Sequence, residues 1–318
     1  MSDSTNKTIL VTGGNGLVGS AIDRITKDNS FYKDVLFISS KMCDLTDSKQ
    51  IHDLFLTKKP YCVIHLAARV GGLFRNMSEK VEMLEDNVIM NINVLRMCHK
   101  FNVKKCVVCL STCIFPNDVS YPIDESMLHN GPPHSSNDSY AYAKRLADIQ
   151  CRAYRNQYGC NFVSIIPTNI YGPNDNYNIN DAHVIPGLIH KCFNAKKEGK
   201  TFDIIGSGSP LRQFIYSDDL ARLILWITEY YNEEEPIILS PPEKSEISIK
   251  DVATLIAREF DYEHMLKITC EGEDGQYKKT ASNKKLMNKI GNFDFTPFSE
   301  GLRKSVKWFI ENYDTARK

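Results

Sequence analysis

Short apolar runs alternate with amphipathic stretches through the first half of the chain. The runs are apolar throughout, which is typical of strands that are buried on both faces of a parallel sheet. The stretches between them have a helical period. Strands are predicted at residues 8–12, 35–39, 61–67, 105–111 and 161–168, and helices at 17–27, 47–57, 82–101 and 139–158. This alternation predicts a doubly wound α/β fold with helices on both faces of the sheet.

The pattern changes after residue 170. A long polar loop at 171–187 precedes a predicted helix that ends near 197, and a strand and helix at 214–231 then resemble the first half. We expect two domains. A Rossmann-type cofactor domain covers residues 1–170 plus 213–240, and a smaller mixed α/β substrate domain covers 171–212 plus 241–318.

Composition limits the class of partner. The chain has 39 Lys plus Arg and 39 Asp plus Glu, so no net charge attracts a nucleic acid or an anionic membrane, and a small molecule is expected. Only Cys106 and Cys109 among its 10 cysteines have Cys-x-x-Cys spacing; they lie inside a predicted apolar strand and no second pair accompanies them, so the cysteines give no sign of a metal site. Buried free thiols and the absence of a signal-type apolar segment at the N-terminus predict a cytoplasmic protein.

Glycines at 13, 16 and 19 follow the first predicted strand directly and open the first predicted helix. A tight turn, close approach to a pyrophosphate and close packing of helix on strand all require glycine here. The helix N-terminus then offers free N–H groups to the phosphates. A glycine-rich turn without a ligand is the alternative, but the strand–turn–helix context favours a dinucleotide site.

The end of the second strand indicates which dinucleotide binds. Folds specific for NAD usually carry an acid there to bind the ribose 2′-hydroxyl. This chain has Ser39, Ser40 and Lys41 instead, and hydroxyls with a cation suit a 2′-phosphate, so we predict NADPH/NADP. Asp44 comes later and is expected near the adenine.

Tyr140 and Lys144 lie four residues apart and share one face of the helix predicted at 139–158. A lysine cation lowers the pKa of a nearby phenol, which makes the phenol a usable acid or base. Tyr142 points nearly opposite and is expected to pack. Ser111, at the end of the preceding strand, would donate a hydrogen bond to a substrate carbonyl.

Together these motifs resemble the extended short-chain dehydrogenases/reductases. The resemblance implies that Ser111, Tyr140 and Lys144 form the reductase triad. The segment "HLAARVGG" at 65–72 fits as well, with Ala67 and Ala68 near the cofactor.

Cys113 follows Ser111 where family members that dehydrate nucleotide sugars usually carry an acidic pair. In an extended backbone residues 111 and 113 share a face, so Cys113 is expected to point into the site. A thiol can be tuned to act as a base on a carbon beside a ketone. A small buried core thiol is the alternative.

The full set of motifs, including "PTNIYGPNDN" and "GSGSPLRQFIYSDDLA", is similar to family members that act on GDP-4-keto-6-deoxymannose. Those members epimerise C3 and C5 and then reduce C4 with NADPH. The resemblance implies that Cys113 is the base and His183 the acid. It also implies a cofactor site formed by Gly13, Gly14, Asn15, Gly16, Leu17, Val18, Gly19, Ser39, Ser40, Lys41, Asp44, Leu66, Ala67, Ala68, Leu110, Tyr140, Lys144, Pro167, Thr168, Asn169, Ile170 and His183.

The GDP-sugar site that the resemblance implies comprises Lys191, Ile205, Arg212 and Asp274. Ile205 stands where the family is expected to have an aromatic residue, and Lys191 where bacterial members have Arg.

The sequence leaves two alternative functions. The chain could be another nucleotide-sugar epimerase or reductase of the same family, or a cofactor-binding regulatory protein without turnover. The absence of an acidic pair after Ser111 argues against a dehydratase, and an intact triad argues against a regulatory protein. Apolar residues on the helices at 82–101 and 139–158 suggest a homodimer.

Overall fold

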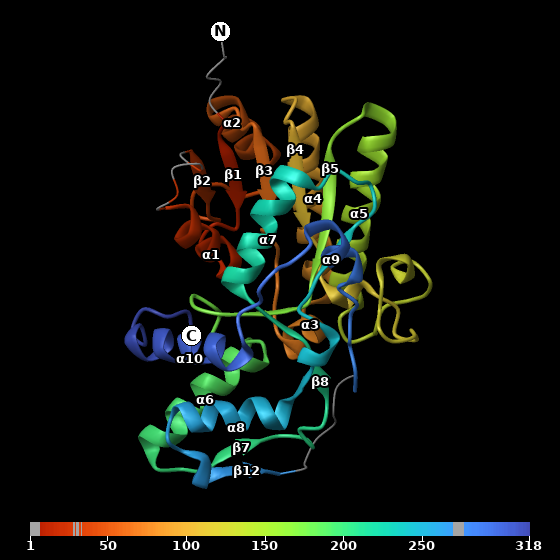
Figure 1. The fold of residues 1–318 in the computed structure, drawn as a ribbon. Coiled ribbons are helices and arrows are strands. Elements are labelled where there is room, and N and C mark those ends of the chain that lie inside the picture. Colours follow the sequence, from red (N-terminus) through yellow and green to blue (C-terminus); the bar gives the residue numbers. More distant parts are fainter. Residues whose placement is uncertain (1–6, 28, 30–31, 33, 270–276) are drawn as a thin grey trace.

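The computed structural model describes residues 7–27, 29, 32, 34–269 and 277–318. Two lobes are visible in Figure 1. The upper lobe is a sheet flanked by helices, and the lower lobe consists of helices with short strands.

The upper lobe contains a six-stranded sheet with the order β10-β5-β4-β3-β1-β2. Every neighbouring pair is parallel. The strands are β1 (Ile9–Thr12), β2 (Val35–Ile38), β3 (Cys62–His65), β4 (Lys105–Cys109), β5 (Phe162–Pro167) and β10 (Ile237–Leu239). The strand order reverses between β1 and β3, so the loops that follow these two strands diverge and leave a crevice for a ligand.

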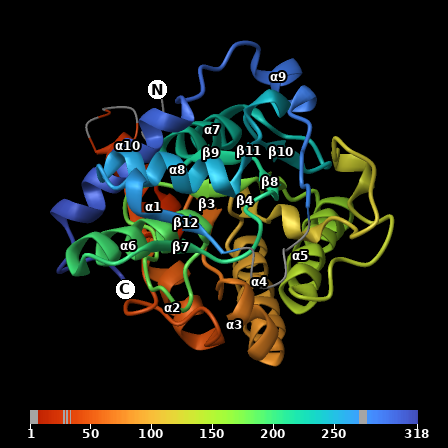
Figure 2. The same cartoon turned by 90° about the horizontal axis from the view of Figure 1, so that it is seen from below.

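Successive side chains of each strand enter opposite cores. Leu10 packs with α2 (Ser48–Lys58), α4 (Lys80–Lys100) and α5 (Asp138–Tyr158), whereas Val11 packs with α1 (Leu17–Thr26) and α7 (Ser217–Tyr230). The view from below in Figure 2 separates these two helical layers. Burial on both faces explains why the strand sequences are apolar throughout, and it confirms the predicted doubly wound fold.

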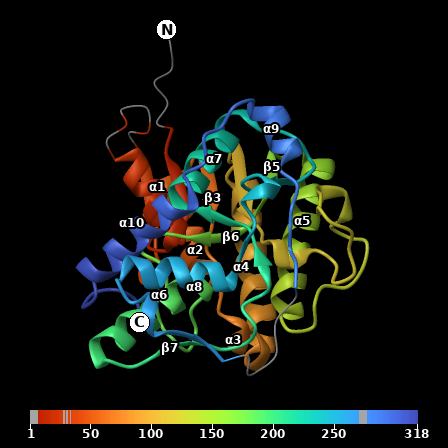
Figure 3. The same cartoon turned by 60° about the horizontal axis from the view of Figure 1, so that its bottom comes forward.

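The lower lobe has its own apolar core, which is rich in aromatic residues. It is built from α6 (Val184–Glu198), α8 (Ile249–Glu259) and α10 (Phe298–Glu311), with β7 (Phe202–Ile204) and β12 (Leu266–Ile268) paired in parallel at its edge. Figure 3 shows α8 beside α6 beneath the sheet. The rings of Tyr177 and Phe309 stack with their centroids 4.4 Å apart, which ties the loop before α6 to α10.

Two short strand pairs join the segments between the lobes. β6 (Asn169–Tyr171) pairs in parallel with β9 (Phe214–Tyr216), and β8 (Leu211–Arg212) pairs with β11 (Ile247–Ser248) in the antiparallel sense.

The predicted polar loop at 171–187 is too long, because α6 already begins at Val184. Pro186 lies in the first turn of that helix, where its missing N–H has no intrahelical partner in any case. The short helices α3 (Leu73–Ser78) and α9 (Lys284–Ile290) were not predicted. They are too short for a periodic pattern to be recognised.

Two helical glycines differ in the space around them and provide a test of packing. A Cβ on Gly301 in α10 would overlap the Tyr171 hydroxyl and lie 2.9 Å from the Tyr216 ring. A Cβ on Gly187 in α6 would meet only Ala182 Cβ, at 3.5 Å. We expect Gly301→Ala to lower the free energy of unfolding by about 1–3 kcal/mol because it overpacks the core. Gly187→Ala should leave it unchanged or raise it by about 0.5–1 kcal/mol. Urea unfolding monitored by circular dichroism distinguishes the two, and equal effects would contradict this packing.

Candidate active site

The turn between β1 and α1 has the shape that a dinucleotide pyrophosphate needs. Gly13 has φ +71°, and a Cβ there would lie 2.9 Å from the backbone nitrogen of Ala67. Gly16 is the N-cap of α1; no side chain caps the helix, and its first turn contains no acidic residue. The N–H groups of the first turn therefore face an anion site without competition from a side chain, and the residues present fit the cofactor.

The end of β2 lies beside this turn, because Gly14 N–H donates to the Ile38 carbonyl at 2.9 Å. Ser39 is half-buried, and Ser40 and Lys41 are exposed beyond it. The Asp44 carboxylate accepts hydrogen bonds from the backbone N–H and the hydroxyl of Thr46, at 2.9 and 2.7 Å.

A buried hydrogen-bond chain supports the loop that contains Leu66, Ala67 and Ala68. The Ala67 N–H donates to Thr12 Oγ1 (3.2 Å), which lies 2.8 Å from His65 Nδ1. His65 Nε2 lies 3.1 Å from Asn91 Oδ1, and Asn91 Nδ2 donates to the Ala143 carbonyl on α5. Burial lowers the pKa of His65 to about 3, so its imidazole is neutral, with the proton on Nε2. The chain of bonds links the glycine turn to the helix that carries Tyr140.

Tyr140 and Lys144 lie one above the other on α5, with the Lys144 Nζ 5.7 Å from the Tyr140 ring centroid. Lys144 is 2% exposed, and its ammonium donates to the Cys109 carbonyl at the end of β4, at 2.8 Å. Tyr142 points elsewhere and is 47% exposed, so the expectation that it packs in the core is wrong. Its ring lies 5.7 Å from the Arg145 guanidinium instead.

The expected lowering of the Tyr140 pKa is also not observed. Burial raises the pKa of the phenol well above its usual value, with further contributions from Cys113 and Cys109. Burial also lowers the pKa of Lys144. Desolvation thus outweighs the attraction between the two groups, because Lys144 is buried and protein surrounds the half-buried Tyr140.

Cys113 lies beside Ser111, but not for the predicted reason. Residues Thr112–Ile114 form a 3₁₀ turn rather than an extended strand, and the Ser111 Oγ accepts the Cys113 N–H at 3.4 Å. Burial raises the pKa of the Cys113 thiol, while the Ser111 hydroxyl and the cations of Lys279 and Lys144 lower it. The thiol therefore lies within the electrostatic reach of the Tyr140–Lys144 pair.

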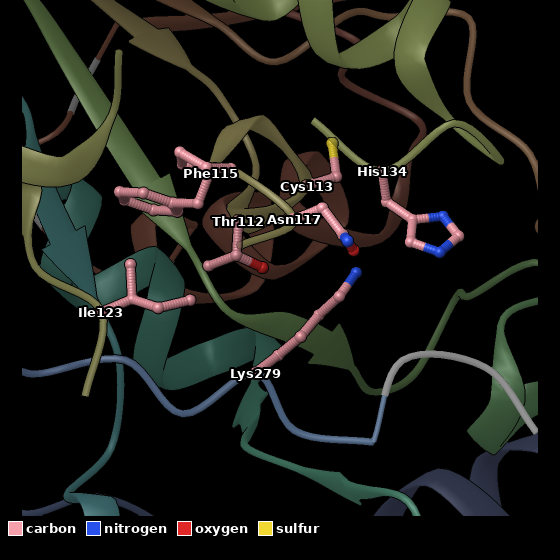
Figure 4. A pocket seen from close by; sticks show the side chains of 8 residues that line it. Thr112, Cys113, Phe115, Asn117, Ile123, His134 and Lys279 are labelled. Carbon is pink, nitrogen blue, oxygen red and sulfur yellow. The ribbon is translucent and has the colours of Figure 1, made fainter. Parts of the chain in front are cut away.

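A small pocket opens at this turn, and Figure 4 shows its side chains. It is lined by Thr112, Cys113, Phe115, Pro116, Asn117, Ile123, His134 and Lys279. Asn117, His134 and Lys279 were not among the predicted site residues. No local pattern marks Lys279, because it reaches the pocket from the last fifth of the chain. Burial lowers the pKa of Lys279, and Cys113 partly opposes that shift.

His183 is the N-cap of α6 and makes no capping hydrogen bond with its side chain. The side chain is exposed, yet desolvation lowers its pKa and Asp181 partly opposes this shift. The imidazole therefore has protein atoms around it while part of its surface stays open to solvent. His183 does not line the Cys113 pocket among the described residues, so the two proposed proton-transfer groups are not brought into contact.

The remaining predicted residues are spread over both lobes. Pro167 ends β5, Thr168 links it to β6, and Asn169 and Ile170 begin β6. The buried Thr168 hydroxyl has no partner among the described residues. Lys191 is half-buried on α6, and Ile205 is 70% exposed after β7. Burial lowers the pKa of Arg212, whose guanidinium donates to the Leu211 carbonyl. Leu110 is buried after β4, and Asp274 lies outside the described residues.

Comparison with known proteins identifies the group to which the chain belongs. The model of the NAD dependent epimerase/dehydratase family matches residues 9–239. A GDP-L-fucose synthase of Dictyostelium discoideum is 53% identical over 320 residues, with all of both chains covered. This chain belongs to the NAD dependent epimerase/dehydratase family, in its GDP-L-fucose synthase group.

Other members of the group support the same placement. A probable GDP-L-fucose synthase of Drosophila melanogaster is 49% identical, with 98% of this chain and 100% of that protein covered. The crystal structure of a GDP-L-fucose synthetase from Naegleria fowleri bound to NADP is 47% identical, with a TM-score of 0.95 and coverage of 100% of this chain and 97% of that one. The predicted resemblance to the extended short-chain dehydrogenases/reductases is thereby confirmed.

No described helix is long and apolar enough to cross a membrane. The described residues also contain no group of three or more His, Cys, Asp and Glu side chains placed to hold a metal ion.

Alkylation of Cys113 tests the electrostatics of this pocket. Lys279→Met removes a cation that stabilises the thiolate, so the pKa of Cys113 should rise and its reaction with iodoacetamide should shift to higher pH. Peptide mass spectrometry across a pH series measures this for Cys113 alone. Lys278→Met is the matched control, because Lys278 forms an ion pair with Glu246 and does not line the pocket. An unchanged profile in Lys279→Met, or the same shift in both variants, would contradict the assignment.

Proposed function

We propose that this chain converts GDP-4-keto-6-deoxy-D-mannose to GDP-L-fucose. It epimerises C3 and C5 and then reduces the C4 ketone with NADPH. The observation that carries the proposal is the placement of Cys113 beside Ser111 and within electrostatic reach of Tyr140 and Lys144. One ketone acidifies both flanking carbons and is itself the group to be reduced, so a single cleft can serve both reactions. Full-length relatives that carry the name of this activity support the proposal.

Cys113 is the base for epimerisation. Its thiolate removes the proton from the carbon beside the ketone, and the C–H electron pair moves to the C4 oxygen to form an enolate. The hydroxyls of Ser111 and Tyr140 donate hydrogen bonds to that oxygen. Lys279 and Lys144 favour the thiolate against the effect of burial.

His183 is the acid on the opposite face of the sugar. It donates a proton to the carbanionic carbon, which inverts the centre. Cys113 then releases its proton to solvent and His183 takes one up from solvent, so that the same pair of residues can act at the second carbon. The Asp181 carboxylate raises the pKa of His183 against desolvation and so favours the protonated imidazole that this step needs. The separation between His183 and the Cys113 pocket fits these roles, because the sugar must lie between base and acid.

Reduction uses the other residues of the cleft. NADPH would supply the hydride for C4 when it is bound in the cradle after β1. Tyr140 donates its phenolic proton to the C4 oxygen, and the raised pKa of its phenol keeps that proton in place until then. Lys144, bound to the Cys109 carbonyl, keeps a positive charge beneath the phenol.

The glycine turn would hold the pyrophosphate, and Gly13, Gly14, Asn15, Gly16, Leu17, Val18 and Gly19 contribute backbone to it. Lys41, with Ser39 and Ser40, would bind the 2′-phosphate of the adenosine ribose, and Asp44 would lie near the adenine. Leu66, Ala67, Ala68, Leu110 and the link of Pro167, Thr168, Asn169 and Ile170 would form the remaining wall, which His183 reaches from α6.

The GDP-sugar would bind against Lys191, Arg212, Asp274 and Ile205. Arg212 suits the diphosphate because its planar guanidinium can bind two oxygens at once, whereas Lys191 acts as a point charge. The domain assignment follows these roles: residues 1–170 plus 213–240 bind the cofactor, and 171–212 plus 241–318 bind the nucleotide sugar. The nine described cysteines are all free thiols, which supports a cytoplasmic location.

Solvent exchange separates the two chemistries. The keto sugar is incubated in D2O with each variant, while deuterium at C3 and C5 is followed by NMR and NADPH oxidation by absorbance. Cys113→Ala should incorporate almost no deuterium, because the base is lost. Tyr140→Phe should still incorporate deuterium but oxidise NADPH at least a hundredfold more slowly, because the C4 alkoxide has no proton donor.

Tyr142→Phe is the matched control on the same helix, since its side chain is 47% exposed and does not line the Cys113 pocket. It should retain both activities within about twofold. Normal deuterium entry in Cys113→Ala would remove Cys113 from the mechanism and leave it as a buried thiol.

We further propose that the enzyme is a homodimer that forms through α4 and α5. On α5, Tyr142, Leu146 and Ile149 are 47%, 38% and 50% exposed and lie on one face at helical spacing. On the adjacent α4, Val81, Leu84 and Ile89 are 60%, 38% and 40% exposed. Figure 2 shows the two helices side by side at the edge of the lobe.

Sedimentation velocity tests this interface. Ile149→Glu places an unpaired charge at the centre of the apolar face and should convert the dimer to a monomer. Leu56→Glu on α2, where the side chain is 53% exposed on another helix, should leave the dimer intact. A monomeric unmodified protein, or a dimer that persists in Ile149→Glu, would refute this interface.

A further inference from the structure

The loop that precedes α6 is bound to the segment that follows β3. The Gly72 N–H donates to two oxygens of Asp181, the backbone carbonyl at 3.0 Å and the carboxylate Oδ1 at 3.2 Å. The other carboxylate oxygen, Asp181 Oδ2, accepts from Arg75 Nη1 at 2.9 Å. Three hydrogen bonds thus join two segments that belong to different lobes.

The glycine pair at 71–72 makes this contact possible. A Cβ on Gly72 would lie 2.9 Å from the Ala182 carbonyl oxygen, and a Cβ on Gly71 would lie 2.7 Å from Asp181 Oδ1. A side chain at position 72 would push the 181–182 backbone away, and one at position 71 would displace the side chains of Arg75 and Asp181. Ala67 and Ala68 of the same sequence motif face the cofactor cradle, but the two glycines are explained by the loop that they contact.

Arg75 is held from its other side as well. Its Nε donates to Glu79 Oε2 at 2.9 Å, and Glu79 also accepts from Arg69 at 2.7 Å. Arg69 in turn binds Asp86 at 2.9 Å. Charges of alternating sign therefore fix the guanidinium that Asp181 meets, and the Asp181 side chain is only 20% exposed. A network of this kind has less freedom than an isolated surface pair.

His183 is two residues from this contact. Its side chain has no capping bond of its own, so its place in the cleft depends on the backbone that enters α6. The other end of the same loop is anchored in the lower lobe, where Tyr177 stacks on Phe309. The backbone at 181–182 is therefore the point at which the upper lobe determines where the imidazole lies.

We propose that Gly71, Gly72, Arg75 and Asp181 form a positioning clamp that sets His183 against the face of the sugar opposite Cys113. This inference rests on the proposed role of His183 as the acid. The clamp residues act through His183 and do not themselves touch substrate. Misplacement of a reacting group by about 1 Å can slow a reaction about a hundredfold, so a contact of this kind can control inversion.

The test scores two events at C5 separately. If Cys113 alone removes the proton and returns one from the same face, hydrogen is exchanged for deuterium and the configuration at C5 is retained. Inversion of C5 also needs the proton from His183. In D2O without NADPH, Asp181→Asn and Arg75→Met should lower the inversion rate at least tenfold and change the exchange rate less than twofold. Gly72→Ala should have the same effect through steric displacement, with no change of charge.

A double-mutant cycle supplies the second criterion. If Arg75 and Asp181 act as one unit, the double variant should invert no more slowly than either single variant. Asp86→Asn is the matched control, because it removes a carboxylate from the same ion network at a position that does not touch the loop. It should retain inversion within twofold. The midpoint of thermal unfolding is measured for each variant, and Gly72→Ala and Arg75→Lys provide the test if Asp181→Asn does not fold.

His183→Asn separates failure of the clamp from failure of the acid role. His183→Asn could lose inversion while Asp181→Asn and Gly72→Ala invert normally. That result would overturn the clamp and leave the role of His183 as the acid in place. Normal inversion in His183→Asn would overturn the acid role, and with it the basis of the clamp. Equal loss of exchange and inversion in the clamp variants would also overturn the proposal, because a general disturbance of the cleft would account for it.

Discussion

The hydrogen bond from the buried Lys144 ammonium to the Cys109 carbonyl is the contact on which the site depends. A charge that is removed from water is tolerated only where polar groups replace its hydration, and here a strand end supplies one. The bond fixes α5 against the end of β4. Tyr140 lies one helical turn before the lysine, and Ser111 and Cys113 lie just beyond the strand, so one contact between two elements determines the relative places of all four side chains. If α5 moved away from the end of β4, the Lys144 ammonium would lose this partner and remain as an uncompensated buried cation. That cost keeps the helix against the strand.

Most of the upper lobe could be predicted from the sequence because its signals are local. A strand buried on both faces is apolar at every position, and the Gly13 turn needs the backbone freedom that only glycine has. The shared face of Tyr140 and Lys144 follows from their spacing alone. These predictions needed no knowledge of distant contacts. The structure confirms the predicted doubly wound fold with strands buried on both faces.

The predictions that failed depended on tertiary contacts. The prediction that residues 111 and 113 share a face assumed that the strand stays extended past Ser111, but the Ser111 hydroxyl caps a 3₁₀ turn that the pattern cannot reveal. Tyr142 was expected to pack, whereas the surface of α5 leaves it exposed. Lys279 enters the cleft from a segment far along the chain, and no periodicity connects it with Cys113. The effect of burial on the pKa of Tyr140 was likewise missed, because the depth of a residue is a property of the folded chain. The roles given to the individual site residues remain predictions.

The close approach of Gly72 to the Ala182 carbonyl also limits how the sequence can change over evolutionary time. A substitution that adds a side chain at 72 is accommodated only if the loop at 181–182 has already moved back. A loop that has moved back, in turn, loses the hydrogen bonds that favour its present course. Neither segment can drift neutrally by itself, so changes at these two places should occur together among divergent descendants, although more than a hundred residues of chain separate them.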